Sequence, residues 1–107
     1  MKYIEKHFGF STADAEDVQL QFINCDLTLT FTDWQEKKQQ IFFRNILAFC
    51  WQEPDETDIR DDETYEVTDS SWLEQQAKLQ DVLAQKYAHY KLCFNAIGTL
   101  DVLASRI

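Results

Sequence analysis

Hydrophobic and polar residues alternate along much of the first half of this chain, and that period of two is typical of antiparallel strands with one buried face. The alternation is clearest over residues 18–24 and 27–32, where aromatic and β-branched residues are frequent. Residues 39–51 predict one long strand. Its alternation is interrupted near Arg44 and Asn45, where we expect a bulge or bend that lets the strand coil around a core.

After an acidic stretch, the period changes to that of a helix over about residues 71–87. Ser71 and Glu74 fit a capping box at its start. Apolar residues then recur on one helical face at spacings of seven, four and four: Trp72, Leu79, Leu83 and Tyr87. Residues 90–106 alternate again and predict a C-terminal hairpin. Together these elements predict one α+β domain over residues 1–107, an antiparallel sheet of about five to seven strands with the amphipathic helix packed across one face.

Composition indicates a packed, water-soluble domain. With 107 residues and 45% hydrophobic content, the chain is long enough for one core. It contains no run of about 18 apolar residues, and its first residues lack the apolar stretch of a signal peptide, so we expect a cytoplasmic location. The three cysteines, Cys25, Cys50 and Cys93, lack Cys-x-x-Cys spacing and lie in apolar or alternating segments, which predicts reduced, buried thiols.

Negative charge is concentrated in one segment. The formal net charge is −9, and residues 53–69 contain nine acids against one arginine, so this segment carries eight of the nine net charges. We expect most of it to be a solvated acidic loop, with a short edge strand over Thr64–Thr68. This negative charge disfavours binding to nucleic acids and to anionic membranes. It favours binding to a protein partner with a basic surface. The candidate partner-binding residues are Asp55, Glu56, Asp58, Asp61, Asp62, Glu63 and, in a polar turn outside the segment, Trp34.

No residue pattern predicts a catalytic, cofactor or metal site. The two histidines, His7 and His89, are too few for a histidine-rich metal site. A nucleophilic pair of Cys93 with His89 would place the two residues about 13 Å apart along one strand, at about 3.3 Å per residue, beyond hydrogen-bond reach. The acidic segment lacks the spacing and central glycine of an EF-hand, which leaves only weak Ca²⁺ binding. We therefore expect a protein that is not an enzyme.

Several stretches resemble small bacterial β-rich immunity proteins and similar families found beside polymorphic toxins: Phe8–Phe10, Asp14–Val18, Leu27–Phe31, Asp33–Trp34 and Ile41–Phe43. The closing segment Tyr90–Ala104 resembles the last strands of these families. The Trp-Pro and His-Asp pairs of their opening turn are absent from this sequence, so no functional residue is carried over. The resemblance implies a bacterial, non-enzymatic protein that neutralises a partner by binding it.

Two functions from different classes follow from these patterns. The first is an interaction module of the immunity type that docks a basic partner through the acidic segment. The alternative is a small-molecule or lipid-binding domain with a cavity between the sheet and the helix. The segment could also be only a solvated loop, as many charge runs are. Salt dependence separates the first two, because ionic strength weakens charge-driven binding and leaves an apolar pocket nearly unaffected.

Overall fold

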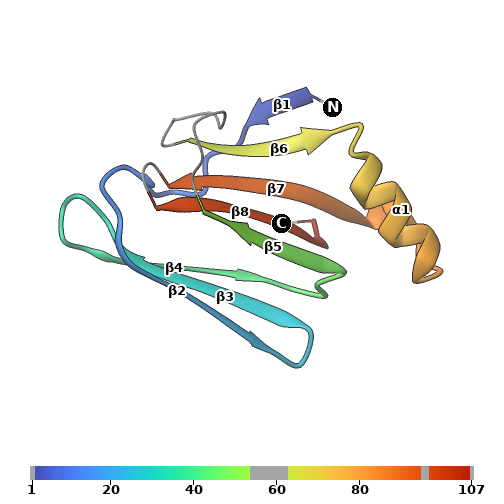
Figure 1. Ribbon diagram of the computed structural model, residues 1–107, viewed down its shortest axis with the longest axis horizontal. Helices are drawn as coiled ribbons and strands as arrows, with labels where there is room; N and C mark the ends of the chain where they lie inside the picture. The colour runs from blue at the N-terminus through green and yellow to red at the C-terminus, as the bar shows by residue number, and fades with distance from the viewer. Residues whose placement is uncertain (1, 54–62, 95–96, 107) are drawn as a thin grey trace.

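The computed structural model describes residues 2–53, 63–94 and 97–106, and these residues form an α+β fold of two antiparallel sheets and one α-helix (Figure 1). The elements are β1 (Lys2–Glu5), β2 (Glu16–Ile23), β3 (Asp26–Thr32), β4 (Lys38–Phe43), β5 (Ala48–Gln52), β6 (Thr64–Thr68), α1 (Ser71–Leu79), a 3₁₀ turn (Ala84–Lys86), β7 (Tyr87–Phe94) and β8 (Gly98–Ser105). The larger sheet has the order β1-β6-β7-β8-β5 and the smaller one the order β2-β3-β4. No helix among these residues is long and apolar enough to cross a membrane.

The core lies between the two sheets, and both contribute to it through strand alternation. In the smaller sheet, Leu27 of β3 lies opposite Phe43 of β4, and both side chains are fully buried. The larger sheet contributes fully buried side chains of β7 and β8. Aromatic rings join the two layers, since Phe31 and Phe94 meet edge to face with centroids 5.3 Å apart. This geometry adds to the stabilisation from apolar burial.

The strands divide between two sheets, so the α+β class is confirmed but the prediction of one sheet of about five to seven strands was wrong. The division occurs where residues 39–51 were expected to form one strand. β4 ends at Phe43 and pairs with β3, whereas β5 starts at Ala48 and pairs with β8. Between them, Asn45 takes a φ of 52°, a left-handed conformation that asparagine tolerates. The expected bend is therefore at the right place, but it transfers the chain from one sheet to the other.

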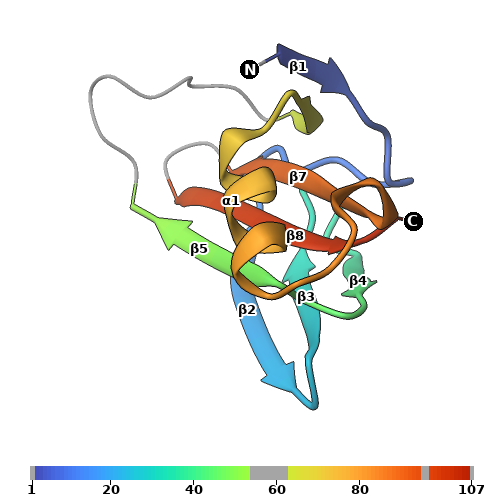
Figure 2. The same ribbon diagram turned by 90° about the vertical axis from the view of Figure 1, so that its right-hand side faces the viewer.

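The helix is shorter than predicted and begins with a different cap. Ser70, rather than Ser71, is the N-cap, and its Oγ accepts the backbone N–H of Leu73 at 3.1 Å. α1 ends at Leu79, well before the predicted end. Because Leu79, the last helical residue, and Leu83 are 71% and 55% exposed, the expected apolar face is already lost at the end of the helix. Figures 1 and 2 show α1 at one end of the larger sheet, beside β7.

Residues 53–69 are not a single loop. β6 occupies Thr64–Thr68 and pairs with β1 on one side and β7 on the other, so it is an inner strand and not the predicted edge strand. β1 has no counterpart among the predicted strands. The C-terminal hairpin of β7 and β8 is confirmed, although its first strand already starts at Tyr87.

Candidate functional site

The predicted acidic site maps to the end of the larger sheet that is remote from α1. We call this the acidic end and define it by Glu53, Glu63 and the β3–β4 turn that contains Trp34. Glu53 follows β5 and Glu63 precedes β6, and both side chains are exposed. Figure 1 shows the end of β5 and the start of β6 at the same end of the sheet, with β7 and β8 between them. The carbonyl of Glu63 accepts the backbone N–H of Cys93 at 2.9 Å, which fixes its place beside β7. The remaining candidates lie outside the described residues: Asp55, Glu56, Asp58, Asp61 and Asp62.

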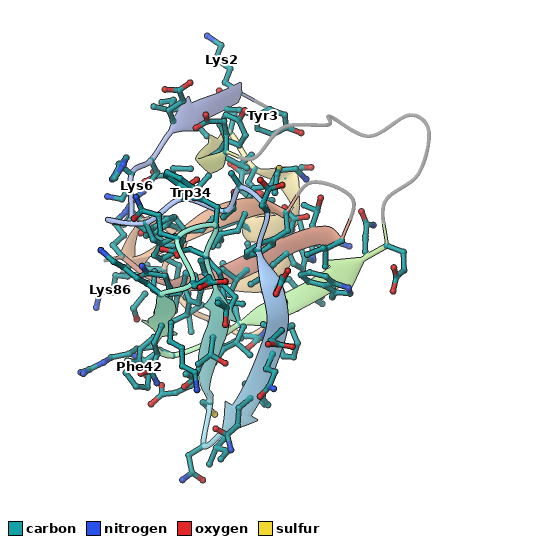
Figure 3. The ribbon with its side chains drawn as sticks, turned by 90° about the vertical axis from the view of Figure 1, so that its left-hand side faces the viewer. Lys2, Tyr3, Lys6, Trp34, Phe42 and Lys86 are labelled. Atoms are coloured by element: carbon teal, nitrogen blue, oxygen red, sulfur yellow. The ribbon has the colours of Figure 1, made fainter. Side chains whose placement is uncertain are left out.

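Trp34 is 58% exposed, and Figure 3 shows it in a view onto the acidic end. Its turn is fixed by the neighbouring Asp33. Oδ1 of Asp33 accepts the backbone N–H groups of Gln35 and Lys37, both at 2.9 Å. Oδ2 accepts the side-chain amide of Gln39, also at 2.9 Å, and these hydrogen bonds, that of Gln39 foremost, lower the pKa of Asp33. The turn therefore holds Trp34 out toward solvent.

A second candidate site lies on the face of the larger sheet that points away from the core. Strand alternation places His89 and Lys91 of β7 on this face, and Lys91 lies opposite Asp101 of β8. Nε2 of His89 is 2.7 Å from Oδ1 of Asp101, and Nζ of Lys91 is 3.2 Å from Oδ2 of the same carboxylate. Nδ1 of His89 lies 2.8 Å from Oγ of Ser70. This cluster connects the start of α1 to two strands.

One arrangement of protons satisfies the cluster. In it, Ser70 Oγ accepts the N–H of Leu73 and donates its own hydroxyl proton to Nδ1 of His89. Nε2 of His89 then carries the ring proton and donates it to Asp101. Burial by itself raises the pKa of Asp101, but the hydrogen bond from His89 and the charge of Lys91 outweigh it, so this pKa lies below its ordinary value. The carboxylate is therefore ionised at neutral pH.

Serine, histidine and aspartate are also the parts of a hydrolytic triad, but the position of Ser70 does not fit that chemistry. A nucleophilic serine must present its Oγ to a bound substrate. Ser70 is 4% exposed and does not line the pocket beside the cluster. Its contacts instead cap α1 and fix the ring of His89. Sequence reasoning missed the cluster. The available signal was the presence of ionisable residues at positions 89, 91 and 101 of mostly apolar strands.

A pocket of about 370 Å³ lies beside this cluster, between α1 and the larger sheet. Trp72 of α1 and Tyr3 of β1 supply aromatic walls, and Lys91 and Asp101 supply polar ones. Trp72 meets the ring of His89 edge-on, with centroids 5.3 Å apart. Nζ of Lys91 lies 5.8 Å from the ring centroid of Tyr3, within range of a cation–π contact. The pocket thus combines aromatic surface with one ion pair.

Two of the three cysteines contradict the prediction of buried thiols. Cys25 is exposed in the β2–β3 turn, where it takes a φ of 66°. Cys50 is exposed on β5 and lines the pocket beside α1, whereas Cys93 is buried as predicted. Within the described ranges, no three histidine, cysteine, aspartate or glutamate side chains are grouped so that they could hold a metal ion.

The resemblance to bacterial immunity proteins predicted from the sequence rests on segments that lie partly in β2, β3, β4 and the β7–β8 hairpin, with Phe8–Phe10 and Asp33–Trp34 outside these strands. It assigns no role to any single residue, so a functional assignment rests on the geometry and charge described above. Comparisons of the chain with protein-family models, with curated proteins and with solved structures find no match.

Proposed function

We propose that this protein is a non-enzymatic interaction module that binds the basic surface of another protein with its acidic end. The observation that carries the proposal is the concentration of charge, since residues 53–69 hold eight of the nine net negative charges. Such a field accelerates encounter with a partner of opposite sign and disfavours partners of the same sign. An immunity-type inhibitor that covers the basic surface of a nucleic-acid-binding protein works by this chemistry.

Two features of the acidic end suit it to contact. The carboxylates of Glu53 and Glu63 make no ion pair with any described residue, so no cation in the described part of the chain neutralises their charges. Trp34 is 58% exposed at the same end, and tryptophans are frequent anchors of protein interfaces. The proposed contact residues also include Asp55, Glu56, Asp58, Asp61 and Asp62.

The test begins with affinity capture from the native host at low salt, followed by purification of the captured protein. Its binding is then measured over a range of salt concentrations with the wild type and with a variant that lacks four charges: Asp58→Asn, Asp61→Asn, Asp62→Asn and Glu63→Gln. We expect association to slow by about tenfold or more, with a flatter salt dependence and a smaller change in dissociation. Folding should be unaffected, because surface charge pairs contribute only about 0–1 kcal/mol.

A control variant removes charge at the other end of the molecule. Glu74 on α1 and Asp81 just after it are both exposed, and Glu74→Gln combined with Asp81→Asn should leave the association rate close to that of the wild type. Unchanged association in the four-charge variant would contradict the proposal. Unfolding of that variant would contradict it too, because the carboxylates would then be structural partners rather than docking groups.

The pocket beside α1 supports a second candidate function, the binding of a small apolar or lipid-like molecule. The specific observation is that Trp72 and Tyr3 line a cavity between helix and sheet. Fatty acids and small aromatic compounds are suitable probes, and a bound probe should slow the reaction of Cys50 with a thiol reagent while the exposed Cys25 keeps its rate. Protection that is independent of salt and lost in Trp72→Ala would support this function. Equal reactivity with and without every probe would count against it.

A further inference from the structure

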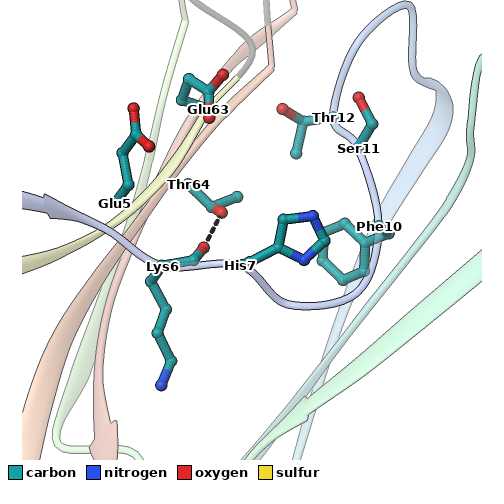
Figure 4. A pocket seen from close by; sticks show the side chains of 8 residues that line it. All are labelled: Glu5, Lys6, His7, Phe10, Ser11, Thr12, Glu63 and Thr64. Atoms are coloured by element: carbon teal, nitrogen blue, oxygen red, sulfur yellow. Dashed lines mark hydrogen bonds between the residues drawn. The ribbon is translucent and has the colours of Figure 1, made fainter.

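A second pocket, of about 360 Å³, lies at the acidic end, between the segment after β1 and the start of β6 (Figure 4). Residues between Glu5 and Thr12 form one side of it, and Glu63 and Thr64 form the other. Among the described residues, it shares no lining side chain with the pocket beside α1. Because Glu63 also belongs to the acidic segment, this pocket is part of the surface that we propose contacts a basic partner.

One polar atom of this pocket, Oγ1 of Thr12, has no hydrogen-bond partner in the described part of the chain. Thr12 is 1% exposed, and Figure 4 shows its hydroxyl directed into the pocket. Neighbouring hydroxyls are partnered. Thr64 donates to the backbone carbonyl of Lys6, and Ser11 Oγ accepts the N–H of Ala13 at 3.1 Å. A buried hydroxyl without a partner is uncommon in native proteins, so Thr12 points to a group that a ligand supplies.

The charges around the pocket favour a cationic ligand. The carboxylates of Glu5 and Glu63 are exposed at its rim and make no ion pair with a described residue. Lys6 also belongs to the lining, but its ammonium points away from both carboxylates (Figure 4). Nδ1 of His7 accepts a backbone N–H of its own loop at 3.0 Å. A positively charged group in the pocket would therefore meet two carboxylates and the free hydroxyl of Thr12.

We infer that this pocket receives an arginine side chain of the basic partner, an inference that rests on the proposed function. A guanidinium is planar and has five N–H donors, so it can bind both carboxylates and still donate a hydrogen bond to Thr12. Its flat face stacks on aromatic rings, and Phe10, whose ring also packs against Phe8 and Phe31, is one of the lining residues. The compact ammonium of lysine has three donors and no planar face, so it matches this arrangement less well.

The test uses N-acetyl-arginine amide as the probe and follows the backbone NMR signals of Thr12 and Thr64. We expect saturable shifts at these positions, and none with N-acetyl-citrulline amide, which has nearly the same shape but no charge. In Thr12→Val the affinity should fall about tenfold or more, because a hydrogen bond to a charged group is lost. The same variant should raise the urea midpoint of unfolding, because it removes an unpaired buried hydroxyl. Damage to the fold cannot produce this combination of signs.

A second comparison tests whether the two carboxylates bind the probe, with two double variants that each remove two negative charges. Glu5→Gln combined with Glu63→Gln should weaken binding of the arginine probe by about tenfold or more, because two charge-assisted hydrogen bonds are lost. Glu74→Gln combined with Asp81→Asn removes the same charge beside α1 and should change the affinity little. The inference would be overturned by unchanged affinity in Thr12→Val, by equal binding of the citrulline probe, or by equal effects of the two double variants.

Failure of this inference can be distinguished from failure of the proposed function. A captured basic protein that binds with steep salt dependence, but equally well to Thr12→Val, would leave the function standing and remove arginine from the pocket. The opposite result is also informative. If the arginine probe saturates the pocket but the protein captures no basic partner, the proposed function is overturned. The arginine could then not be assigned to a partner protein.

Discussion

Replacing Ser70 by alanine should destabilise the fold far more than the same change at the adjacent Ser71. Ser70→Ala removes the N-cap of α1, which contributes about 1 kcal/mol in typical helices. It also removes the partner 2.8 Å from Nδ1 of His89, and an unpaired buried acceptor costs about 1–3 kcal/mol. The two effects together give an expected loss of about 2–4 kcal/mol. Ser71 is exposed in the first turn, so Ser71→Ala should change stability by no more than about 0.5 kcal/mol.

Urea unfolding followed by circular dichroism measures both changes. At a slope of about 2 kcal/mol per molar urea, Ser70→Ala should lower the midpoint by about 1–2 M. Ser71→Ala is a matched control, because it deletes the same hydroxyl group one residue away. It also tests the assignment of the cap, because the sequence pattern places the cap at Ser71. An equal or larger loss in Ser71→Ala would refute the assignment of the cap, and a loss below about 0.5 kcal/mol in Ser70→Ala would refute the role of the cluster.

Three further measurements concern the stability cost of leucine substitutions, the reactivity of the thiols and the pH dependence of stability. Leu83→Ala should cost less than about 0.5 kcal/mol, because the side chain is 55% exposed, whereas Leu103→Ala, at a fully buried position, should cost about 2–5 kcal/mol, both measured by urea unfolding. In a timed assay with a bulky thiol reagent, Cys25 and Cys50 should react in the native protein and the buried third thiol only after unfolding. The lowered pKa of Asp101 means that its ionised form stabilises the fold, fully above about pH 4 and progressively less as the pH falls through that lowered pKa. The difference in unfolding free energy between the wild type and Asp101→Asn should therefore narrow at acid pH.

Strand positions could be predicted because alternation depends on residues that are close together in the chain. The segments 18–24 and 27–32 lie within or close to β2 and β3, and the hairpin of β7 and β8 follows the same pattern. The division into two sheets could not be predicted, because it depends on which distant strands pair. β6 lies between β1 and β7, two strands from opposite ends of the chain. Asn45 indicated a break in the pattern, but a local break does not say which sheet the chain enters next.

The end of the helix shows a second limit of periodicity. Leu79 and Leu83 recur at helical spacing, yet Asp81 takes a φ of 55° and the chain turns away from the helix axis. The cap was misplaced by one residue for a related reason. Glu74 lies three residues after Ser71, as in a capping box, but the hydrogen bond to His89 holds Ser70 in the capping position. A tertiary contact thus decided between two local alternatives.

The candidate sites differ in how far they can be recognised from the sequence alone. Net charge is additive, so the acidic segment is visible from composition before any fold is known. The pocket at the acidic end depends on Thr12 and Glu63 coming together from separate segments. The cluster of Ser70, His89 and Asp101 depends in the same way on the helix start meeting two strands. Polar positions 89, 91 and 101 mark the strand residues of the cluster, but residue spacing does not show that Ser70 meets them or that Thr12 meets Glu63.

The two ends of the larger sheet should give variants with opposite behaviour. Ser70 lies at the end beside α1 and Thr12 at the acidic end, and the pockets at these two ends share no described lining residue. Ser70→Ala should lower stability and, at a temperature where it remains folded, bind the arginine probe with the affinity of the wild type. Thr12→Val should raise stability and weaken binding. Weakened binding in folded Ser70→Ala would show that the helix and the acidic end are coupled, so that the arginine pocket could not be treated as an independent site.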